Sequence, residues 1–221
     1  PGHDEDLCTG FLWTEGIIAR PEALTACHSV RENEILAVLH PAATFEAERL
    51  TRHVFANSGC GICGKAAIDN IHNVTCYFPQ KNQPSVSKTL LFSLPERLRA
   101  AQTGFDQTGG VHAAGLFDAS GQLLLLREDV GRHNAVDKVL GAALRAGWPP
   151  PLNQVILLVS GRAGFELVQK ASMAGIGCMA AIGAPSTLAV EMAAASGMTL
   201  TGFLRDHRFN IYCGEERITD D

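Results

Sequence analysis

The chain has 221 residues, of which 46% are hydrophobic, and a formal net charge of −5. A chain of this length can bury one large core or two small ones, and an acidic chain without a basic run is a poor partner for nucleic acid. No apolar stretch is as long as the roughly 18 residues that indicate a membrane span.

The first part of the chain, residues 1–86, is expected to form a small α+β region. Apolar residues in Glu34–Leu39 alternate as in a half-buried strand, and Pro41 would end that strand. Pro, Gln, Asn and Ser are concentrated over residues 79–88, which predicts a linker. The other expected elements are helices at Leu7–Thr14 and Arg20–Ala23 and a helix or strand at Thr44–Val54.

Residues 87–221 carry alternating strand and helix patterns, which predict a three-layer α/β domain on a mixed, largely parallel sheet. The continuous apolar runs Gln154–Val159 and Cys178–Ile182 indicate strands buried on both faces. A helix is expected at Leu94–Gln102, with Ser93 as its N-cap. The remaining expected elements are strands at Gly110–Phe117, Gln122–Arg127, Met198–Leu204 and Arg208–Tyr212 and helices at Asn134–Ala146, Phe165–Ala174 and Leu188–Ala195.

Strand-to-helix junctions are the places where a sheet of this kind binds ligands. They are expected at Glu128–Asn134, Ser160–Gly164 and Gly183–Thr187, and each brings glycine or hydroxyl residues to a helix N-terminus. Free N–H groups and the helix dipole attract phosphate there, and Arg132 and Arg162 could bind phosphate oxygens bidentately. The junctions therefore predict a large phosphate-bearing ligand at one sheet edge. The alternative is that they are only well-capped helices.

Cys60 and Cys63 lie in the glycine-rich segment Ser58–Lys65. Glycine leaves neighbouring side chains uncovered, and the nearby Lys65 favours the thiolate, which is the reactive form. The segment therefore predicts sulfur transfer or persulfide chemistry. The chain has 7 cysteines, an odd number that fits a reducing cytoplasm better than a disulfide scaffold. The cysteines in ordinary segments are Cys8, Cys27, Cys178 and Cys213.

Three other interpretations of these thiols remain open. His72 and Cys76 could complete a structural zinc site with the spacing C-x2-C-x8-H-x3-C. A thioredoxin-like redox pair is a second possibility, although Gly61 and Gly64 make a poor helix start. The third is a pair of inert, buried thiols.

Two further segments carry histidine. His112, which enters a strand, is expected to be a hydrogen-bonded core residue. A zinc deaminase would need an acid where Ala114 stands and a later P-C-x-x-C, so deamination is not expected. The arginines and histidine of Gly202–Arg208 fit a ligand site or a solvated strand connection equally well.

Several segments together closely resemble the formate dehydrogenase accessory sulfurtransferase (FdhD) family. The resemblance runs from about Leu7 to about Tyr212. The block REDVGRHNAVDK is highly specific, whereas CGICG alone is not. The segments that carry the resemblance are Ser58–Lys65, Thr108–Ala114, Arg127–Lys138, Ser160–Arg162, Ala184–Pro185 and Gly202–Arg208.

This resemblance implies a cytidine-deaminase-like fold without deaminase chemistry. It implies a cytoplasmic, homodimeric sulfurtransferase without a structural metal. Such a protein takes sulfur from a cysteine desulfurase and passes it to the molybdenum cofactor, in its bis-molybdopterin guanine dinucleotide form, before insertion into formate dehydrogenase. The runner-up is a non-catalytic chaperone that binds this cofactor, and a third possibility is a zinc-stabilised scaffold.

The resemblance also assigns residues. Cys60 aligns with the persulfide-bearing cysteine, and Cys63 accompanies it. The family normally has a further stretch before the position of Asp4–Leu7, so the N-terminal region is expected to be incomplete at its start. The cofactor-binding segment of the family aligns with Phe203, Leu204, Arg205, Asp206, His207 and Arg208.

Overall fold

The computed structural model describes residues 2–18, 20–32, 34–43, 77–205 and 207–220. The expectations for Thr44–Val54, for Asp206 and for the segment with Cys60 and Cys63 fall outside these residues and stay predictions. So does the alternative in which His72 and Cys76 complete a zinc site.

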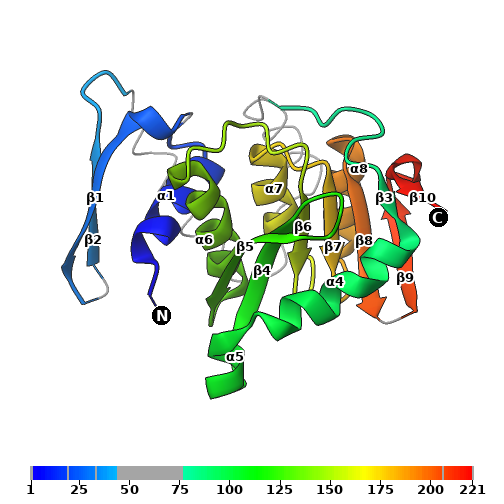
Figure 1. Ribbon diagram of the computed structural model, residues 1–221. Coiled ribbons are helices and arrows are strands. Elements are labelled where there is room, and N and C mark those ends of the chain that lie inside the picture. Colours follow the sequence, from blue (N-terminus) through cyan, green and yellow to red (C-terminus); the bar gives the residue numbers. More distant parts are fainter. Residues whose placement is uncertain (1, 19, 33, 44–76, 206, 221) are drawn as a thin grey trace.

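A six-stranded sheet in the order β5-β4-β6-β7-β8-β9 forms the centre of the molecule (Figure 1). The β6–β7 and β7–β8 pairs are parallel, and the other neighbours are antiparallel. The expected mixed sheet is therefore confirmed, with its parallel pairs at the centre. Its strands are β4 (His112–Phe117), β5 (Leu123–Asp129), β6 (Ile156–Val159), β7 (Cys178–Ala181), β8 (Thr199–Arg205) and β9 (Arg208–Cys213).

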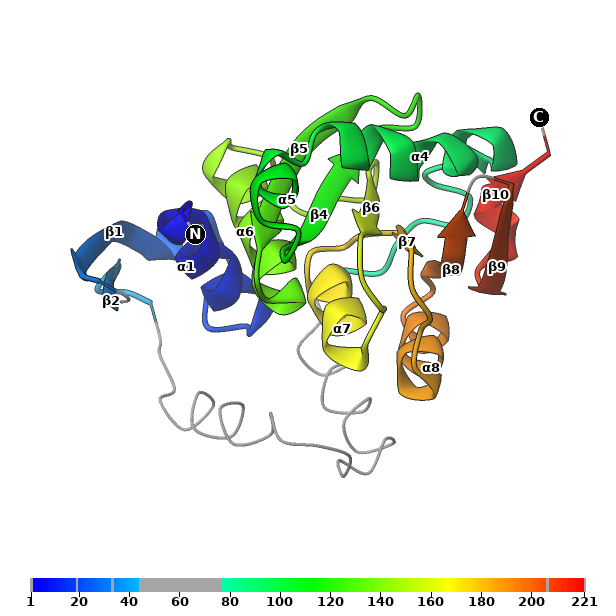
Figure 2. The same ribbon diagram turned by 90° about the horizontal axis from the view of Figure 1, so that it is seen from below.

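Helices cover both faces of this sheet (Figure 2). One face packs against α6 (Arg132–Arg145), α7 (Phe165–Met173) and α8 (Thr187–Ala195), and the other packs against α4 (Lys88–Ala100). Each face has its own cluster of buried side chains because β6 and β7 are buried on both sides. The three expected layers are present, while the specific cytidine-deaminase plan stays a prediction.

Helix α4 begins earlier than the sequence predicts. Its N-cap is Ser87, whose Oγ accepts a hydrogen bond from Leu90 N at 3.2 Å. Ser93, the expected N-cap, instead lies inside the helix, where its hydroxyl donates to the Leu90 carbonyl oxygen at 2.8 Å. The proline at position 95, which suggested a first turn, lies inside the helix as well. Three buried leucines at helical spacing hold α4 to the sheet and outweigh the proline: Leu91, Leu94 and Leu98.

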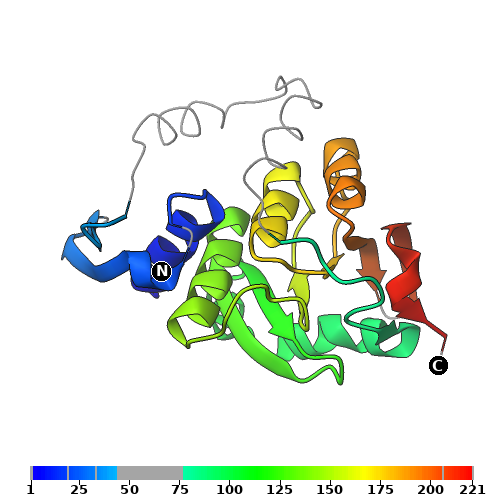
Figure 3. The same cartoon turned by 90° about the horizontal axis from the view of Figure 1, so that it is seen from above.

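The N-terminal part forms helix α1 (Asp4–Thr14), the 3-10 turn η1 (Pro21–Ala23) and the antiparallel hairpin of β1 (Leu24–Arg31) and β2 (Glu34–Leu39). The helix expected at 7–14 and the strand expected at 34–39 are confirmed, whereas β1 was not expected. Figure 3 shows the hairpin beside α1, at the end of the molecule opposite β9. The division of the chain at residue 86 stays a prediction.

Helix α1 packs so closely on α6 that glycine is needed at the contact. A Cβ on Gly10 would lie 1.8 Å from the Asp137 carbonyl oxygen, and one on Gly141 would lie 1.9 Å from the Asp6 carbonyl oxygen. A buried polar network surrounds this contact, in which Asp137 accepts from the Thr14 hydroxyl at 2.7 Å and lies 3.0 Å from Lys170 Nζ. Close backbone approach and buried charge together fix α1 on the body.

Short elements complete the described part of the chain. Helix α5 (Thr103–Thr108) follows α4 and was not expected from the sequence. Strand β3 (Val86–Ser87) pairs in parallel with β10 (Ile218–Thr219), which follows the 3-10 turn η3 (Glu215–Arg217). The expected linker at 79–88 therefore lacks regular secondary structure only up to residue 85, because β3 and then α4 follow.

Candidate functional site

Four strands end at the same edge of the sheet. Strand β4 is antiparallel to both β5 and β6, and β6, β7 and β8 are parallel to one another. Strands β5 to β8 therefore run in one direction, and their ends lie along the lower side of the sheet in Figure 1. We call these strand ends and the junctions that follow them the carboxyl edge. The expectation that the junctions share one edge is confirmed.

Backbone hydrogen bonds connect the junctions along this edge. Ala113 N donates to Ser160 Oγ at 2.8 Å, and Ser160 N donates to the Ala113 carbonyl oxygen at 2.9 Å. Gly183 N donates to the Gly161 carbonyl oxygen at 3.0 Å, and Phe203 N donates to the Gly183 carbonyl oxygen at 3.1 Å. The row runs without a break from β4 to β8, so the second and third junctions hold each other in place.

Glycine at these junctions leaves room for the side chains of their neighbours. A Cβ on Gly161 would lie 3.2 Å from His112 Nδ1 and 4.0 Å from Arg132 Cδ. His112 and Arg132 thus both approach the Gly161 backbone, and His112 lies at the carboxyl edge. A Cβ on Gly183 would lie 2.9 Å from Arg162 Cα. The second junction, which contains Arg162, therefore packs against the third junction, which begins at Gly183.

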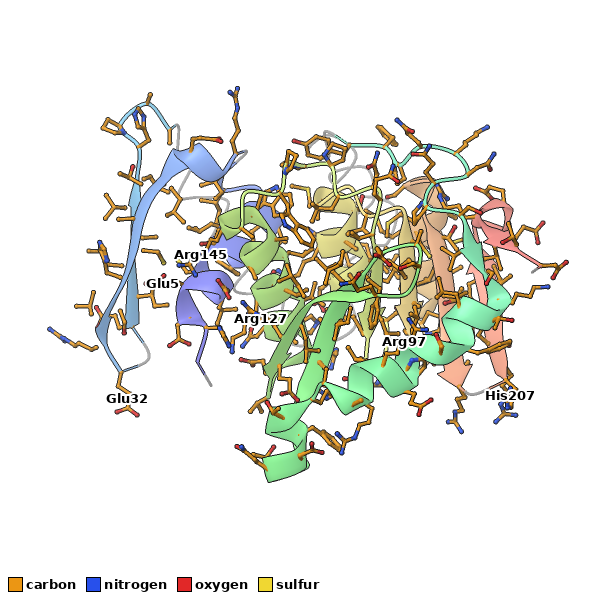
Figure 4. The ribbon with its side chains drawn as sticks, viewed as in Figure 1. Glu5, Glu32, Arg97, Arg127, Arg145 and His207 are labelled. Atoms are coloured by element: carbon orange, nitrogen blue, oxygen red, sulfur yellow. The ribbon has the colours of Figure 1, made fainter. Side chains whose placement is uncertain are left out.

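Much of the block from Arg127 to Lys138 builds the scaffold. Glu128 caps α5, because its Oε2 accepts from Gly104 N at 2.7 Å and its Oε1 from Phe105 N at 2.9 Å. Arg127 Nε donates to Asp6 Oδ2 at 2.8 Å. Figure 4 shows Arg127 and Arg145 beside α1, and both bind the buried Asp6. These charges are committed to internal contacts.

Asp129 fixes the turn into α6. Its Oδ1 accepts from Gly131 N at 2.8 Å and from Asn134 Nδ2 at 3.1 Å, and its Oδ2 lies 2.5 Å from Lys138 Nζ. Burial opposes ionisation of Asp129, but the hydrogen bonds from Lys138 and the Gly131 N–H outweigh it and lower the pKa of the carboxyl. Asp129 and Lys138 are thus a buried ion pair that shapes the first junction.

Arg132 is the first residue of α6 and lies in the first junction. Its Nε is buried and has no hydrogen-bond partner among the residues that the structure describes. The neighbouring His133 Nε2 lies 2.8 Å from Glu166 Oε2, so His133 joins α6 to α7 and lowers the pKa of Glu166. An unpaired guanidinium nitrogen at a helix N-terminus suits an anion.

The helix starts at this edge differ in their capping. The N-caps of α6 and α7 are Gly131 and Gly164, which have no side chain to accept from the first-turn N–H groups. Helix α8 is capped by Ser186, whose hydroxyl accepts from Ala189 N at 3.2 Å. The alternative of simple capping therefore suits α8, while α6 and α7 present the N-terminal geometry that binds phosphate.

The end of β8 carries a strained aromatic residue. Phe203 has a φ of 53°, in the left-handed region that a bulky side chain rarely adopts. Leu204 is fully buried in the core on the α4 side, and the bond from Phe203 N to Gly183 anchors the preceding peptide. These contacts hold Phe203 with 41% of its surface exposed beside the third junction.

Beyond Phe203 the strand pair β8–β9 presents positive charge. Arg205 and Arg208 are paired across the ladder, and both are exposed. His207 projects at the lower right of Figure 4, and its ring lies 6.2 Å from that of Phe92 on α4. A groove of about 730 Å³ opens here. It is lined by Lys88, Phe92, His207, Arg208, Phe209, Asn210, Ile211 and Tyr212.

The segment expected to bind cofactor thus separates into parts. Leu204 serves the core, whereas Phe203, Arg205, His207 and Arg208 face solvent at or next to the carboxyl edge. Sequence reasoning missed Lys88 and Phe92 as neighbours of this segment. The sequence feature that could have revealed them is the helical spacing of apolar residues before Ser93. That spacing would have extended the predicted helix back to Lys88.

Other site types find no support in the described part of the chain. Among its residues, no group of three or more His, Cys, Asp or Glu is arranged to hold a metal ion. Nor does that part contain a helix with the length and apolar character needed to cross a membrane.

A mixed-sheet α/β protein with a basic, glycine-rich carboxyl edge is therefore the class that the fold and site define. The chain matches the model of the FdhD/NarQ family over residues 1–219 and belongs to that family. The chain is 47% identical to the sulfur carrier protein FdhD of Streptomyces avermitilis, with 99% of this chain and 80% of that protein covered. It is 41% identical to the one from Sulfurisphaera tokodaii, with 99% and 81% covered.

A solved structure supports the same assignment. The chain resembles the crystal structure of a protein from Desulfotalea psychrophila that is described as a formate dehydrogenase accessory protein. The TM-score is 0.75 at 26% identity, over 99% of this chain and 81% of that one. The described fold is thus shared with a relative of distant sequence.

Proposed function

We propose that this protein is a sulfur carrier that serves a formate dehydrogenase. Cys60 accepts sulfur from a cysteine desulfurase as a persulfide and delivers it to the molybdenum cofactor in its bis-molybdopterin guanine dinucleotide form. Relatives that match nearly the whole chain are named sulfur carrier proteins, and the Desulfotalea relative is described as a formate dehydrogenase accessory protein. The chemistry of the glycine-rich thiol segment supports the same assignment.

The loading step follows from thiol chemistry. The Cys60 thiolate attacks the outer sulfur of a persulfide on the desulfurase, forming a new S–S bond while the donor cysteine leaves as a thiolate. Lys65 favours the thiolate that starts this reaction. Cys63 has a secondary role, because one thiol is enough to carry one sulfur.

The observation that carries the cofactor proposal is the Arg205–Arg208 pair at the end of β8. A chain with a net charge of −5 needs local positive charge to hold a polyanion. The two arginines and the N-termini of α6 and α7, which lack side-chain caps, supply this positive charge. The groove beside the arginines provides space for a ligand, and exposed Phe203 can pack against a flat ring. Guanine nucleotide binds along this edge.

Mass spectrometry of Cys60 after incubation with a cysteine desulfurase and free cysteine tests the carrier role. We expect a mass increase of one sulfur on Cys60 that a reductant removes. A chaperone that binds the cofactor without moving sulfur is the second candidate, since the basic edge suits it equally. An unmodified Cys60 beside an active desulfurase would favour that chaperone. The homodimer and the cytoplasmic location stay predictions.

A further inference from the structure

A second pair of thiols lies between α1 and the β1–β2 hairpin. A cavity of about 440 Å³ separates these elements. Its wall on α1 consists of residues at helical spacing, which therefore share one face. The cavity is lined by Asp4, Leu7, Cys8 and Phe11 of α1, by Ser29, Glu34 and Ile35 of the hairpin, and by Asn134.

Cys27 lies on the hairpin face that meets this side of α1. It precedes Ser29 by two positions in β1, so both side chains point to the same face of the strand. Ser29 lines the cavity together with Cys8. Burial raises the pKa of the Cys8 thiol to about 12, and the adjoining Cys27 thiol adds to this rise, as expected for two thiols in direct contact.

Both thiols are free and only partly buried, so small reagents can reach them. Among the other free cysteines of the described residues, Cys213 is also partly buried, but its thiol is engaged with the backbone. Cys178 is fully buried, and Cys213 Sγ lies 3.4 Å from the Met198 carbonyl oxygen as a hydrogen-bond donor. Neither Cys8 nor Cys27 belongs to the junctions that form the carboxyl edge.

We propose that Cys8 and Cys27 form a reversible disulfide that fastens the β1–β2 hairpin to α1. The oxidant is a low-molecular-weight disulfide such as glutathione disulfide. The Cys27 thiolate attacks one of its sulfurs, forming a mixed disulfide and releasing one glutathione thiolate. Cys8 then loses its proton, attacks the Cys27 sulfur and displaces the second glutathione. Two protein thiols are oxidised and one glutathione disulfide is reduced to two thiols.

The structural effect follows from the architecture. A two-stranded hairpin is marginally stable alone, and this one relies on α1 for its packing. A bond between Cys8 and Cys27 closes a short loop and restricts the unfolded chain. We expect oxidation to raise the melting temperature by roughly 5–10 °C. The proposed bond does not use Cys60, and it responds to the thiol–disulfide balance around the protein.

The test is a titration of the whole chain with glutathione disulfide, followed by non-reducing digestion and mass spectrometry. We expect a peptide that links Cys8 to Cys27, lost with dithiothreitol and in both Cys8→Ser and Cys27→Ser. Cys213→Ser is the matched control, because it removes a partly buried thiol in β9, at the opposite edge of the sheet, and should keep the linked peptide.

Thermal unfolding is the second readout and does not depend on any activity. The rise on oxidation should be present in the wild type and in Cys213→Ser and absent in Cys8→Ser. Stable glutathione adducts on Cys8 or Cys27 without a linked peptide would overturn the proposal. A linkage of either residue to a different cysteine would overturn it as well.

Discussion

Arg205 and Arg208 are direct partners in the antiparallel ladder between β8 and β9. Like charges that face each other across a ladder destabilise it. Both side chains are exposed, and Phe203 reaches solvent two positions before Arg205. The cofactor site that we propose would relieve this repulsion by placing an anion between the two guanidinium groups.

Replacing both arginines tests this explanation. We expect Arg205→Ala with Arg208→Ala to weaken GDP binding by about two to four orders of magnitude, because hydrogen bonds to charged groups contribute about 1.5–3 kcal/mol each. Calorimetric titration measures the affinity. Arg99→Ala is the matched control, since Arg99 is an exposed arginine that pairs with Asp106 instead. Equal affinities in wild type and double variant would place the cofactor elsewhere. Persulfide formation on Cys60 should survive the double substitution.

The carrier role predicts different effects at the two clustered thiols. Cys60→Ala should abolish activation of the formate dehydrogenase, because no sulfur can be carried, while Cys63→Ala should cost less. Activation of the apoenzyme in a reconstituted assay measures both, and melting temperatures check that each variant folds. Full activation by Cys60→Ala protein would rule out sulfur transfer and favour the chaperone.

The metal content distinguishes a scaffold from a carrier. We expect no stoichiometric zinc in the purified protein and no change of melting temperature with a chelator, since a structural zinc would contribute directly to folding. Elemental analysis and thermal unfolding with and without EDTA measure these. One zinc per chain would contradict this prediction and favour the scaffold.

The contact between α1 and α6 predicts a stability effect remote from the carboxyl edge. Gly10→Ala should lower the free energy of unfolding by about 2 kcal/mol or more, because its Cβ would lie 1.8 Å from the Asp137 carbonyl oxygen. Urea unfolding measures the loss. Gly110→Ala is the control, since the nearest atom to its Cβ, the Thr108 carbonyl oxygen, is 3.8 Å away. A loss of equal size in both variants would contradict the close packing.

The Asp129–Lys138 pair predicts a pH dependence. The pKa of Asp129 is lowered by folding, so its stabilisation is present above the unfolded value of about 3.9 and is lost as the pH falls through the folded value. Asp129→Asn should cost about 3 kcal/mol at pH 7, because Lys138 stays buried without its partner. Melting temperatures from pH 7 down to pH 3 measure this cost, which should shrink below pH 4. A constant difference across that range would contradict the assignment.

Local periodicity was enough to predict most of the fold. The apolar spacing of α6 and the continuous runs of β6 and β7 are properties of neighbouring residues, and their elements formed as expected. The predicted start of α4 was wrong because Pro95 suggested that the first turn of the helix lies there. Packing of Leu91 and Leu94 against the sheet extends the helix toward its N-terminus, back to Lys88. The sequence of β1 does not alternate regularly between apolar and polar residues, so it was not predicted as a strand. Its hydrogen bonding with β2 makes it one.

The site was predictable only in part, for a similar reason. The rule that parallel strands end together placed the junctions on one edge from sequence alone. The use of Glu128 to cap α5 was not predictable, because Gly104 lies far from it in the chain and meets it only in the fold. The same holds for Phe92 beside His207.

The strand order sets a length scale for whatever binds along the carboxyl edge. Because β4 is inserted between β5 and β6, the ends of β5 and β8 are four strand spacings apart, or about 19 Å at roughly 4.8 Å per strand. Arg132 follows the first of these strands and Arg205 ends the last. The ends of these two strands are too far apart for a compact anion to span, so an extended molecule with charged groups at both ends gains most from this surface.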